Sequence, residues 1–299
     1  QFVLNGGKSI FLLDNVQADM DSLYNPTGEM LVYPKENGLG EMLFKYGVRV
    51  NPDLIKDEMG SPIKLAVGQQ GSETVYEQFI WKFAPFAVSQ SNHPIVKNIE
   101  GVKFDFANSI DTLKNNIKKT VLLASSPYSK KIGTPSVVNL GNTVNEKVDP
   151  KDMKPIDPAP LAVLLEGNFT SVYKNRIVPF KSEGFLIEGK ASKIIVISDG
   201  DVIKNQLDEN QQPMELGYDK WTNTLYGNKE FLLNAVNYLL DDKGLINLRT
   251  KEVKLALLDK EKVYTDYNFI RTIIVVLPLA VLAIFGLVFT FLRKKKYTK

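Results

Sequence analysis

The feature that most limits how this chain can fold is an apolar run close to its C-terminus. From Thr272 to Leu292 there are 21 residues without a charge, and the only polar side chains are two threonines near the ends. At about 1.5 Å per residue, a helix of this length covers roughly 30 Å, the thickness of the hydrocarbon core of a bilayer. A helix in a soluble core would show polar residues at every third or fourth position. The run therefore predicts one transmembrane helix over residues 271–292.

The place of the run in the chain excludes two other kinds of apolar segment. A secretory signal peptide would lie at the N-terminus, behind basic residues. A signal for a GPI anchor would end in its apolar tail, whereas this run continues into Arg293 and three lysines. We therefore interpret the apolar run as a membrane anchor.

Basic residues on the two sides of the run predict its orientation. Those after it are Arg293, Lys294, Lys295, Lys296 and Lys299, and those in the twenty residues before it are Lys254, Lys260, Lys262 and Arg271. The counts are similar, but the basic residues are far denser after the run. We therefore expect residues 293–299 to form a cytoplasmic tail, with the bulk of the chain on the other side of the membrane.

Composition excludes several classes of protein. The formal net charge is +3, and subtracting the five positive charges of the tail leaves about −2 for residues 1–292. No stripe of basic residues supports nucleic-acid binding. Because the chain has no cysteine, it can form no disulfide, no thiolate nucleophile and no thiolate metal site.

The length before the apolar run, about 270 residues, is enough for one large domain or two small ones. We expect an exported α/β domain over residues 1–247 and a juxtamembrane segment over 248–270. The first residue is Gln, and the stretch FVLNGGKSIFLLD that follows it is typical of the interior of a domain. We therefore expect the domain to be N-terminally incomplete in this sequence.

Apolar runs rich in β-branched residues or leucine predict buried strands. The clearest runs are Ile10–Leu13, Thr120–Ala124 and Lys193–Ile197, and further candidates are Ile63–Val67, Val102–Phe106 and Leu161–Leu165. Continuous apolar strands suggest burial on both faces, as in a mostly parallel α/β sheet. Two amphipathic helices, starting at the possible caps Asn37 and Asn228 and ending before Gly47 and Gly244, should pack against this sheet.

Polar residues follow three of the predicted strands. They are Asp14 and Asn15, Ser125 and Ser126, and Asp199 and Asp201. In parallel α/β proteins the carboxyl ends of the strands line the crevice where ligands bind, so these six residues are candidate ligand-binding residues. Three carboxylates could in principle hold Mg²⁺ or Ca²⁺. Asp, Asn and Ser also end strands and cap turns for purely structural reasons, and we favour that interpretation over a metal site.

Motifs for catalysis are incomplete. The stretch NGGKS at residues 5–9 lacks the first glycine of a nucleotide-binding loop, because Phe2 occupies that position, and it leads into a strand and not into a helix. His93 is the only histidine, and no G-x-S-x-G elbow is present. We expect no catalytic residue, no cofactor and a structural role for His93.

Six segments, in order, carry a resemblance to a known family. They are 5–22 (NGGKSIFLLDNVQADMDS), 37–57 (NGLGEMLFKYGVRVNPDLIKD), 91–99 (SNHPIVKNI), 160–176 (PLAVLLEGNFTSVYKNR), 192–205 (SKIIVISDGDVIKN) and 226–259, which starts with YGNKEFLLNAVNYLLDDKG. The chain resembles GldG, the auxiliary proteins of gliding-motility-associated ABC transporters of the Bacteroidetes, over nearly its whole length. None of the segments is a catalytic motif, so the resemblance assigns no functional residue.

The resemblance implies a Rossmann-like α/β domain in the periplasm, similar to the GIFT domain of intraflagellar transport, anchored in a bacterial inner membrane. It also implies a GldF-like membrane subunit and a GldA-like ATPase as partners, and a role in binding substrate. Relatives of this type are longer at the N-terminus and begin with another span, which fits an incomplete domain.

Three functions remain open from the sequence. The first is a non-enzymatic, membrane-anchored auxiliary subunit of an ABC transporter, which binds a substrate or transmits movement between proteins. The second is a structural scaffold of the gliding or secretion machinery, independent of transport. The third and weakest is a metal-assisted hydrolase that uses Asp199 and Asp201, since an α/β fold alone would permit it.

Overall fold

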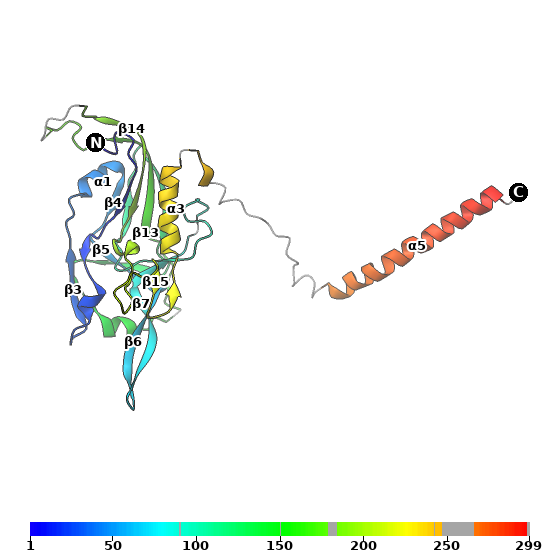
Figure 1. Ribbon diagram of the computed structural model, residues 1–299, viewed down its shortest axis with the longest axis horizontal. Coiled ribbons are helices and arrows are strands. Elements are labelled where there is room, and N and C mark those ends of the chain that lie inside the picture. The colour runs from blue at the N-terminus through cyan, green and yellow to red at the C-terminus, as the bar shows by residue number, and fades with distance from the viewer. Residues whose placement is uncertain (90, 150, 179–183, 242, 247–265, 298–299) are drawn as a thin grey trace. The chain divides into compact units, whose positions relative to one another are not determined.

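The computed structural model describes residues 1–299 apart from 90, 150, 179–183, 242, 247–265 and 298–299. The chain divides into two compact units, residues 1–251 and 252–299. The first unit is a mixed α/β domain, and the second contains one long helix, α5 (Tyr267–Tyr297), as Figure 1 shows. The predicted juxtamembrane segment, 248–270, falls mostly outside the described residues.

The first unit is built from many short strands and few helices. The strands are β1 (Ser9–Leu12), β2 (Val16–Gln17), β3 (Glu29–Pro34), β4 (Val48–Val50), β5 (Asp53–Asp57), β6 (Gly60–Gln70), β7 (Glu73–Ala87), β8 (Val102–Lys103), β9 (Ile110–Thr112), β10 (Lys118–Ala124), β11 (Ser129–Gly133), β12 (Ser136–Asn139), β13 (Pro160–Thr170), β14 (Glu188–Ile197), β15 (Tyr218–Asp219) and β16 (Thr224–Leu225). The helices are α1 (Gly40–Tyr46), α2 (Leu140–Asn145) and α3 (Asn228–Leu240), with two 3-10 turns, η1 (Met20–Leu23) and η2 (Asp201–Ile203).

The central sheet has four strands in the order β1-β14-β13-β10. β1 runs parallel to β14, with Leu12 opposite Ile197, whereas β13 is antiparallel to both β14 and β10. The expected mostly parallel, Rossmann-like sheet is therefore wrong, although all six runs predicted as strands contain strand residues. The remaining sheets have two or three strands, and every pair in them is antiparallel.

The physical reason for this error is visible in the core. Ile195 and Ile197 of β14 belong to a cluster on one face of the sheet, whereas Ile194 and Val196 belong to a cluster on the other face. A strand buried on both faces has a continuous apolar sequence whichever way its neighbours run. Burial on two faces is usual in parallel sheets, but here β13, which is antiparallel to both of its neighbours, is also buried on both faces.

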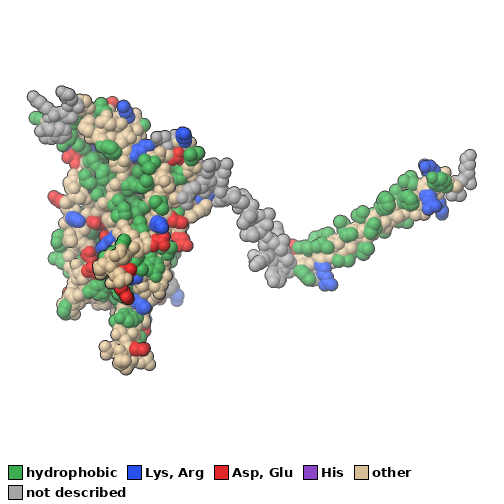
Figure 2. Space-filling model, viewed as in Figure 1, with side chains coloured by type: hydrophobic (Ala, Val, Ile, Leu, Met, Phe, Trp, Pro, Cys, Tyr) green, Lys and Arg blue, Asp and Glu red, His purple; other side chains and the backbone are tan. Residues whose placement is uncertain are grey.

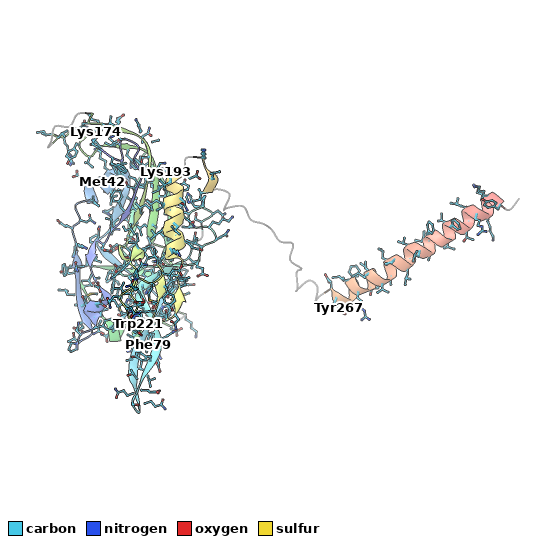
Figure 3. All side chains as sticks on the ribbon, viewed as in Figure 1. Met42, Phe79, Lys174, Lys193, Trp221 and Tyr267 are labelled. Atoms are coloured by element: carbon cyan, nitrogen blue, oxygen red, sulfur yellow. The ribbon has the colours of Figure 1, made fainter. Side chains whose placement is uncertain are left out.

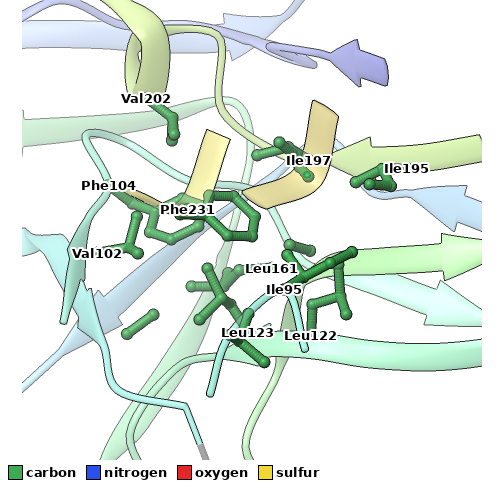
Figure 4. Close-up of a cluster of buried hydrophobic side chains, with 14 of the residues drawn as sticks. Ile95, Val102, Phe104, Leu122, Leu123, Leu161, Ile195, Ile197, Val202 and Phe231 are labelled. Atoms are coloured by element: carbon green, nitrogen blue, oxygen red, sulfur yellow. The ribbon is translucent and has the colours of Figure 1, made fainter. Parts of the chain in front are cut away.

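Helix α3 covers one face of the central sheet. Its side chain Phe231 is fully buried with Phe104 and Ile197 in the cluster that Figure 4 shows. On the same helix the ring of Tyr238 lies under the ammonium group of Lys193 of β14, with Nζ 4.2 Å from the ring centroid. Figure 3 labels Lys193 next to α3. These contacts fix the helix across the strands.

Helix α1 covers the opposite face, where Tyr46 meets Phe169 of β13 edge-on at 4.7 Å between ring centroids. A third cluster lies among the small sheets around Trp81 and Phe83 of β7. The distal part of the β6–β7 hairpin extends beyond this cluster, and its side chains Val67 and Tyr76 are exposed (Figure 1). The domain therefore has an apolar core on each face of the central sheet, a third cluster among the small sheets, and one projecting hairpin.

Both predicted helices form, but their starts differ from the prediction. The Asn37 carboxamide accepts a hydrogen bond from the Leu39 N–H (2.9 Å) before α1 begins, and Gly47 ends α1 with a left-handed φ of 100°. Asn228 does not cap α3, because its side chain bonds instead to the backbone N–H and C=O of Lys103. The amphipathic helix predicted after Asn228 is not apolar on its packed face alone, since Val236 and Leu240 of α3 are exposed.

The long helix α5 contains 31 residues and includes Pro278. Its stretch Phe269–Tyr297 is long and apolar enough to cross a membrane, which agrees with the C-terminal helix expected from the sequence. Figure 2 shows hydrophobic side chains along the helix and basic ones at its C-terminal end.

Candidate functional site

The carboxyl ends of β1, β14 and β10 lie at one edge of the central sheet. Because β13 is antiparallel to both β14 and β10, the two flanking strands run in the same direction, and β1 follows β14. The six candidate residues at the strand ends therefore lie along the same edge, as predicted, even though the mostly parallel sheet on which this prediction was based is wrong. They form two groups, separated by the width of β13.

Asp199 is the most deeply buried member of the first group, at 1% exposure. One carboxylate oxygen accepts the backbone N–H of Asp105 at 2.6 Å, and the other accepts that of Asp201 at 2.7 Å. Burial raises the pKa of Asp199 well above its ordinary value, and the negative charge of Asp105 adds to this effect. Asp199 thus ties together two loops beyond the sheet.

Asp14 and Asn15 continue this network from the end of β1. Asp14 Oδ1 accepts the N–H of Gly200 at 2.7 Å. The Asn15 side chain donates to the Val50 carbonyl at 2.7 Å, and its backbone N–H donates to Asn108 Oδ1 at 2.7 Å. These contacts join the end of β1 to polar groups of neighbouring loops of the chain itself.

Asn108 is the centre of the network, and the sequence analysis missed it. Its backbone N–H donates to the Ser198 carbonyl at 3.0 Å, and its side chain donates to the Asp53 carbonyl at 2.6 Å. The side chain is fully buried. We call Asp14, Asn15, Asn108 and Asp199 the closed network.

Asp201 lies at the border of the closed network. Burial raises its pKa, while Lys204, 3.5 Å away, opposes the rise. Within the described parts of the chain, no group of three or more His, Asp or Glu side chains is placed to hold a metal ion. The magnesium or calcium site considered for Asp14, Asp199 and Asp201 therefore gains no support from their geometry.

Ser125 and Ser126 form the second group, at the end of β10. The Ser126 N–H and hydroxyl both donate to the buried carboxylate of Asp57. The Ser125 hydroxyl lies 2.7 Å from that of Ser129 and accepts the Ala159 N–H at 2.9 Å. These bonds hold residues 125–129 against the end of β5 and lead the chain into β11.

A hollow of about 300 Å³ opens beside this second group. Its lining comes from the turn after β5, the start of β11 and the loop before β13. The lining residues are Glu58, Tyr128, Ser129, Lys130, Lys131, Val148, Asp152, Met153, Lys154 and Ile156. We call this feature the β11 hollow.

A buried ion pair underlies the β11 hollow. Glu58 and Lys82 meet at 2.7 Å between Oε2 and Nζ, with side chains 10% and 6% exposed. Lys82 also donates to the Glu146 carbonyl at 3.0 Å. A hydrogen bond from Lys56, together with the nearby charges of Lys56 and Lys82, holds the pKa of Glu146 below its ordinary value. Of these four charged residues, Glu58 is the one that lines the hollow, and the others lie behind it.

Gly60 makes the close packing beneath the β11 hollow possible. A Cβ atom at Gly60 would lie 2.2 Å from the Trp81 carbonyl oxygen, so no larger residue fits there without a shift of the backbone. This close approach carries β6 against β7 immediately after Glu58. The acidic side chain is thereby fixed next to Lys82.

A second and more open hollow, of about 590 Å³, lies between α1 and the segment after β13. Its lining residues are Glu41, Phe44, Lys45, Leu113, Lys114, Asn115, Val172 and Arg176. Arg176 is bound in an ion pair to Glu41. None of the six predicted residues contributes to it.

His93 has the structural role that the sequence predicts. Its Nδ1 accepts the Ile95 N–H at 3.3 Å, and its ring meets Tyr238 of α3 edge-on at 4.7 Å. Burial lowers the pKa of His93, and the charge of Glu166 partly opposes this. Lys8 and Ser9 of the NGGKS stretch lead into β1, as expected, and not into a helix.

Comparison with known proteins places the chain in a family. The family described as an ABC-type uncharacterized transport system matches residues 1–235. An uncharacterized protein of Borreliella burgdorferi is 24% identical over 302 residues, which cover 99% of this chain and 52% of the relative, so the chain spans about half the length of that protein. No solved structure matches the chain. Because the family match extends over most of its length, the chain belongs to this family of ABC transport auxiliary proteins.

Proposed function

We propose that the protein is a non-enzymatic, membrane-anchored auxiliary subunit of an ABC transporter, and that its first unit binds a small substrate outside the cytoplasm. The observation that carries this proposal is the joining of a family-matched domain, 1–235, to an apolar helix of 31 residues. The division into an exported domain (1–247), a juxtamembrane segment (248–270), a span (271–292) and a tail (293–299) is part of the proposal.

A binding role, and not a catalytic one, agrees with the geometry of the sheet edge. The oxygens of Asp199 accept backbone N–H groups, and Asp14 does the same for Gly200. Each oxygen of Asp199 accepts one backbone N–H and the side chain is almost fully buried, so this carboxylate is poorly placed to act as a general base or a metal ligand. These contacts weaken the alternative of a metal-assisted hydrolase.

The orientation and the partners are proposed on the sequence. The dense basic residues after the span favour a cytoplasmic tail and a periplasmic domain in a bacterial inner membrane. The resemblance to GldG favours gliding motility as the process, a GldF-like membrane subunit and a GldA-like ATPase as partners, and no nucleic acid.

The test is to isolate the chain from its native membrane in mild detergent and identify the bound proteins by mass spectrometry. Stoichiometric recovery of an ABC membrane subunit and an ATPase is the expected result. Recovery of motility or secretion proteins without either ABC component would overturn the proposal.

A scaffold independent of transport is the second candidate, and one surface favours it. Leu31 of β3 and Val137 of β12 are direct cross-strand neighbours, and their side chains are 61% and 62% exposed, with exposed Tyr33 on the same strand. Apolar side chains that gather on an exposed sheet face often mark protein contacts. Deletion of the ATPase separates the candidates, because a scaffold would keep its location and its partners.

A further inference from the structure

The β11 hollow differs from the closed network because a space of about 300 Å³ opens onto one of its carboxylates, that of Glu58. A carboxylate offers about four lone-pair positions. Among the described residues, Lys82 is the ion-pair partner of Glu58 and engages one oxygen, Oε2. Because Glu58 also lines the hollow, its remaining capacity is available to a donor that enters there.

The rim of the hollow carries the opposite charge. Lys130, Lys131 and Lys154 line it, against Glu58 and Asp152. Lys131 pairs with Asp111 at 3.5 Å, whereas Lys154 has no ion pair within the part of the chain that the structure describes. Lys130 adds to the positive charges that lower the pKa of Glu146. A ligand therefore meets a recessed acceptor and exposed cations in one space.

The rest of the lining is apolar, and the space is small. Met153, Ile156, Val148 and the ring of Tyr128 contribute carbon surface. The volume of about 300 Å³ is at the lower limit of pockets for small ligands, which run from roughly 300 to 1,000 Å³. This suits a compact ligand with one apolar side chain and two charged ends.

We propose that the β11 hollow binds a small zwitterion of the amino-acid or dipeptide class, with its ammonium group at Glu58 and its carboxylate at Lys154. The assignment rests on the proposed function, since it names the substrate class of the auxiliary subunit. An anion without a donor would bring negative charge against Glu58 and supply it with no second hydrogen bond beside that of Lys82. A cation without an acceptor would lie among three lysines.

The test uses the full chain in detergent micelles and three probes. They are alanyl-leucine, N-acetyl-alanyl-leucine, which lacks the ammonium group, and alanyl-leucinamide, which lacks the carboxylate. Titration calorimetry should show that alanyl-leucine binds about tenfold more tightly than the acetylated probe, since the ammonium group loses a charged hydrogen bond to the recessed Glu58. It should bind about two- to fivefold more tightly than the amide, because Lys154 is exposed and its ion pair with the carboxylate is weaker. Equal affinity for the three probes, or no binding at millimolar concentration, would overturn the proposal.

Two variants locate the charged ends of the ligand. Glu58→Gln should remove the preference over the acetylated probe, and Lys154→Ala should remove the preference over the amide. Lys151→Ala is the matched control, because this exposed lysine lies in the same loop but does not line the hollow. If Lys154→Ala and Lys151→Ala behave alike, the carboxylate does not bind at Lys154 and the assignment is wrong.

Failure of this assignment and failure of the proposed function are distinguishable. If the ABC subunits co-purify but the three probes bind equally, the auxiliary function stands and the ligand class falls. If the probes are discriminated but no ABC component is recovered, the hollow keeps its assignment and the transporter role falls.

Discussion

One edge of the central sheet shows two uses of the same kinds of polar residue. Beyond β1 and β14, the carboxylates of Asp14 and Asp199 accept hydrogen bonds from backbone N–H groups, and the Asn15 side chain donates one to a backbone carbonyl. Beyond β5, whose Asp57 accepts hydrogen bonds from Ser126 at the end of β10, Glu58 meets one lysine and lines a hollow. The comparison teaches that position at a strand end does not decide the role of a polar residue. The two regions differ in whether a hollow opens onto the polar group, as it does at Glu58.

The largest effect is expected where the floor of the hollow is broken. Lys82→Met removes the cationic partner of Glu58 and leaves a carboxylate buried without compensation. Losing one partner of a buried ion pair costs about 3–5 kcal/mol, so the free energy of unfolding, measured by denaturant titration of the first unit's fluorescence, should fall by this amount.

The double variant Glu58→Gln with Lys82→Met is the control for this change. It removes both charges and should recover a large part of the lost stability, because no buried charge is left unpaired. A single variant as stable as the parent would mean that Glu58 is solvated, and the contrast with the closed network would disappear.

The next effect tests the closed network. Asp199→Ala leaves the backbone N–H groups of Asp105 and Asp201 without an acceptor, at about 1–3 kcal/mol each. Asp199→Asn keeps one acceptor oxygen and should cost less. Both variants should bind alanyl-leucine with the affinity of the parent, and loss of binding in a variant that still melts cooperatively would show that the two halves of the edge act as one site.

The pH dependence of stability should reveal Asp199 as well. Its folded pKa is raised, so its contribution is fully present below its ordinary value of 3.8 and is lost as the pH rises through the folded pKa. The parent should therefore lose more stability than Asp199→Asn as the pH rises from about 4 toward neutrality. Melting curves of both proteins across this range give the difference, and parallel curves would contradict the assigned pKa shift.

Much of the fold follows from the sequence for a simple reason. The apolar run IIVI of β14 and the amphipathic pattern of α3 can be read from the sequence, and each predicts that the element is buried on at least one side. The direction of β13 is not recorded in this way, because its side chains are buried on both faces whichever way it runs. The sequence alone can therefore predict where the strands lie in the chain, but not which strands pair or in which direction they run.

Only part of the candidate site could be predicted from the sequence. The strand-end residues do meet at one edge, but Glu58, Lys130 and Lys154 come from separate segments that converge because Ser129 of β11 pairs with Asp57 of β5. One sequence signal could have pointed to them. Lys82 interrupts the aromatic strand FIWKFAPF, and a lysine among buried residues requires an acidic partner.

The smallest effect on stability is expected at the rim of the β11 hollow. This prediction separates most clearly a residue that binds ligand from a residue that stabilises the fold. Lys154 is exposed and has no ion pair among the described residues, so Lys154→Ala should change the free energy of unfolding by less than about 0.5 kcal/mol. The same change should remove the preference of the hollow for a free carboxylate. Asp199→Ala should do the reverse, with a large loss of stability and no loss of binding. Melting temperatures and calorimetric affinities of both variants, with Lys151→Ala as the control, measure stability and ligand binding separately for each residue. A Lys154→Ala protein that loses stability but keeps its ligand preference would show that Lys154 is structural.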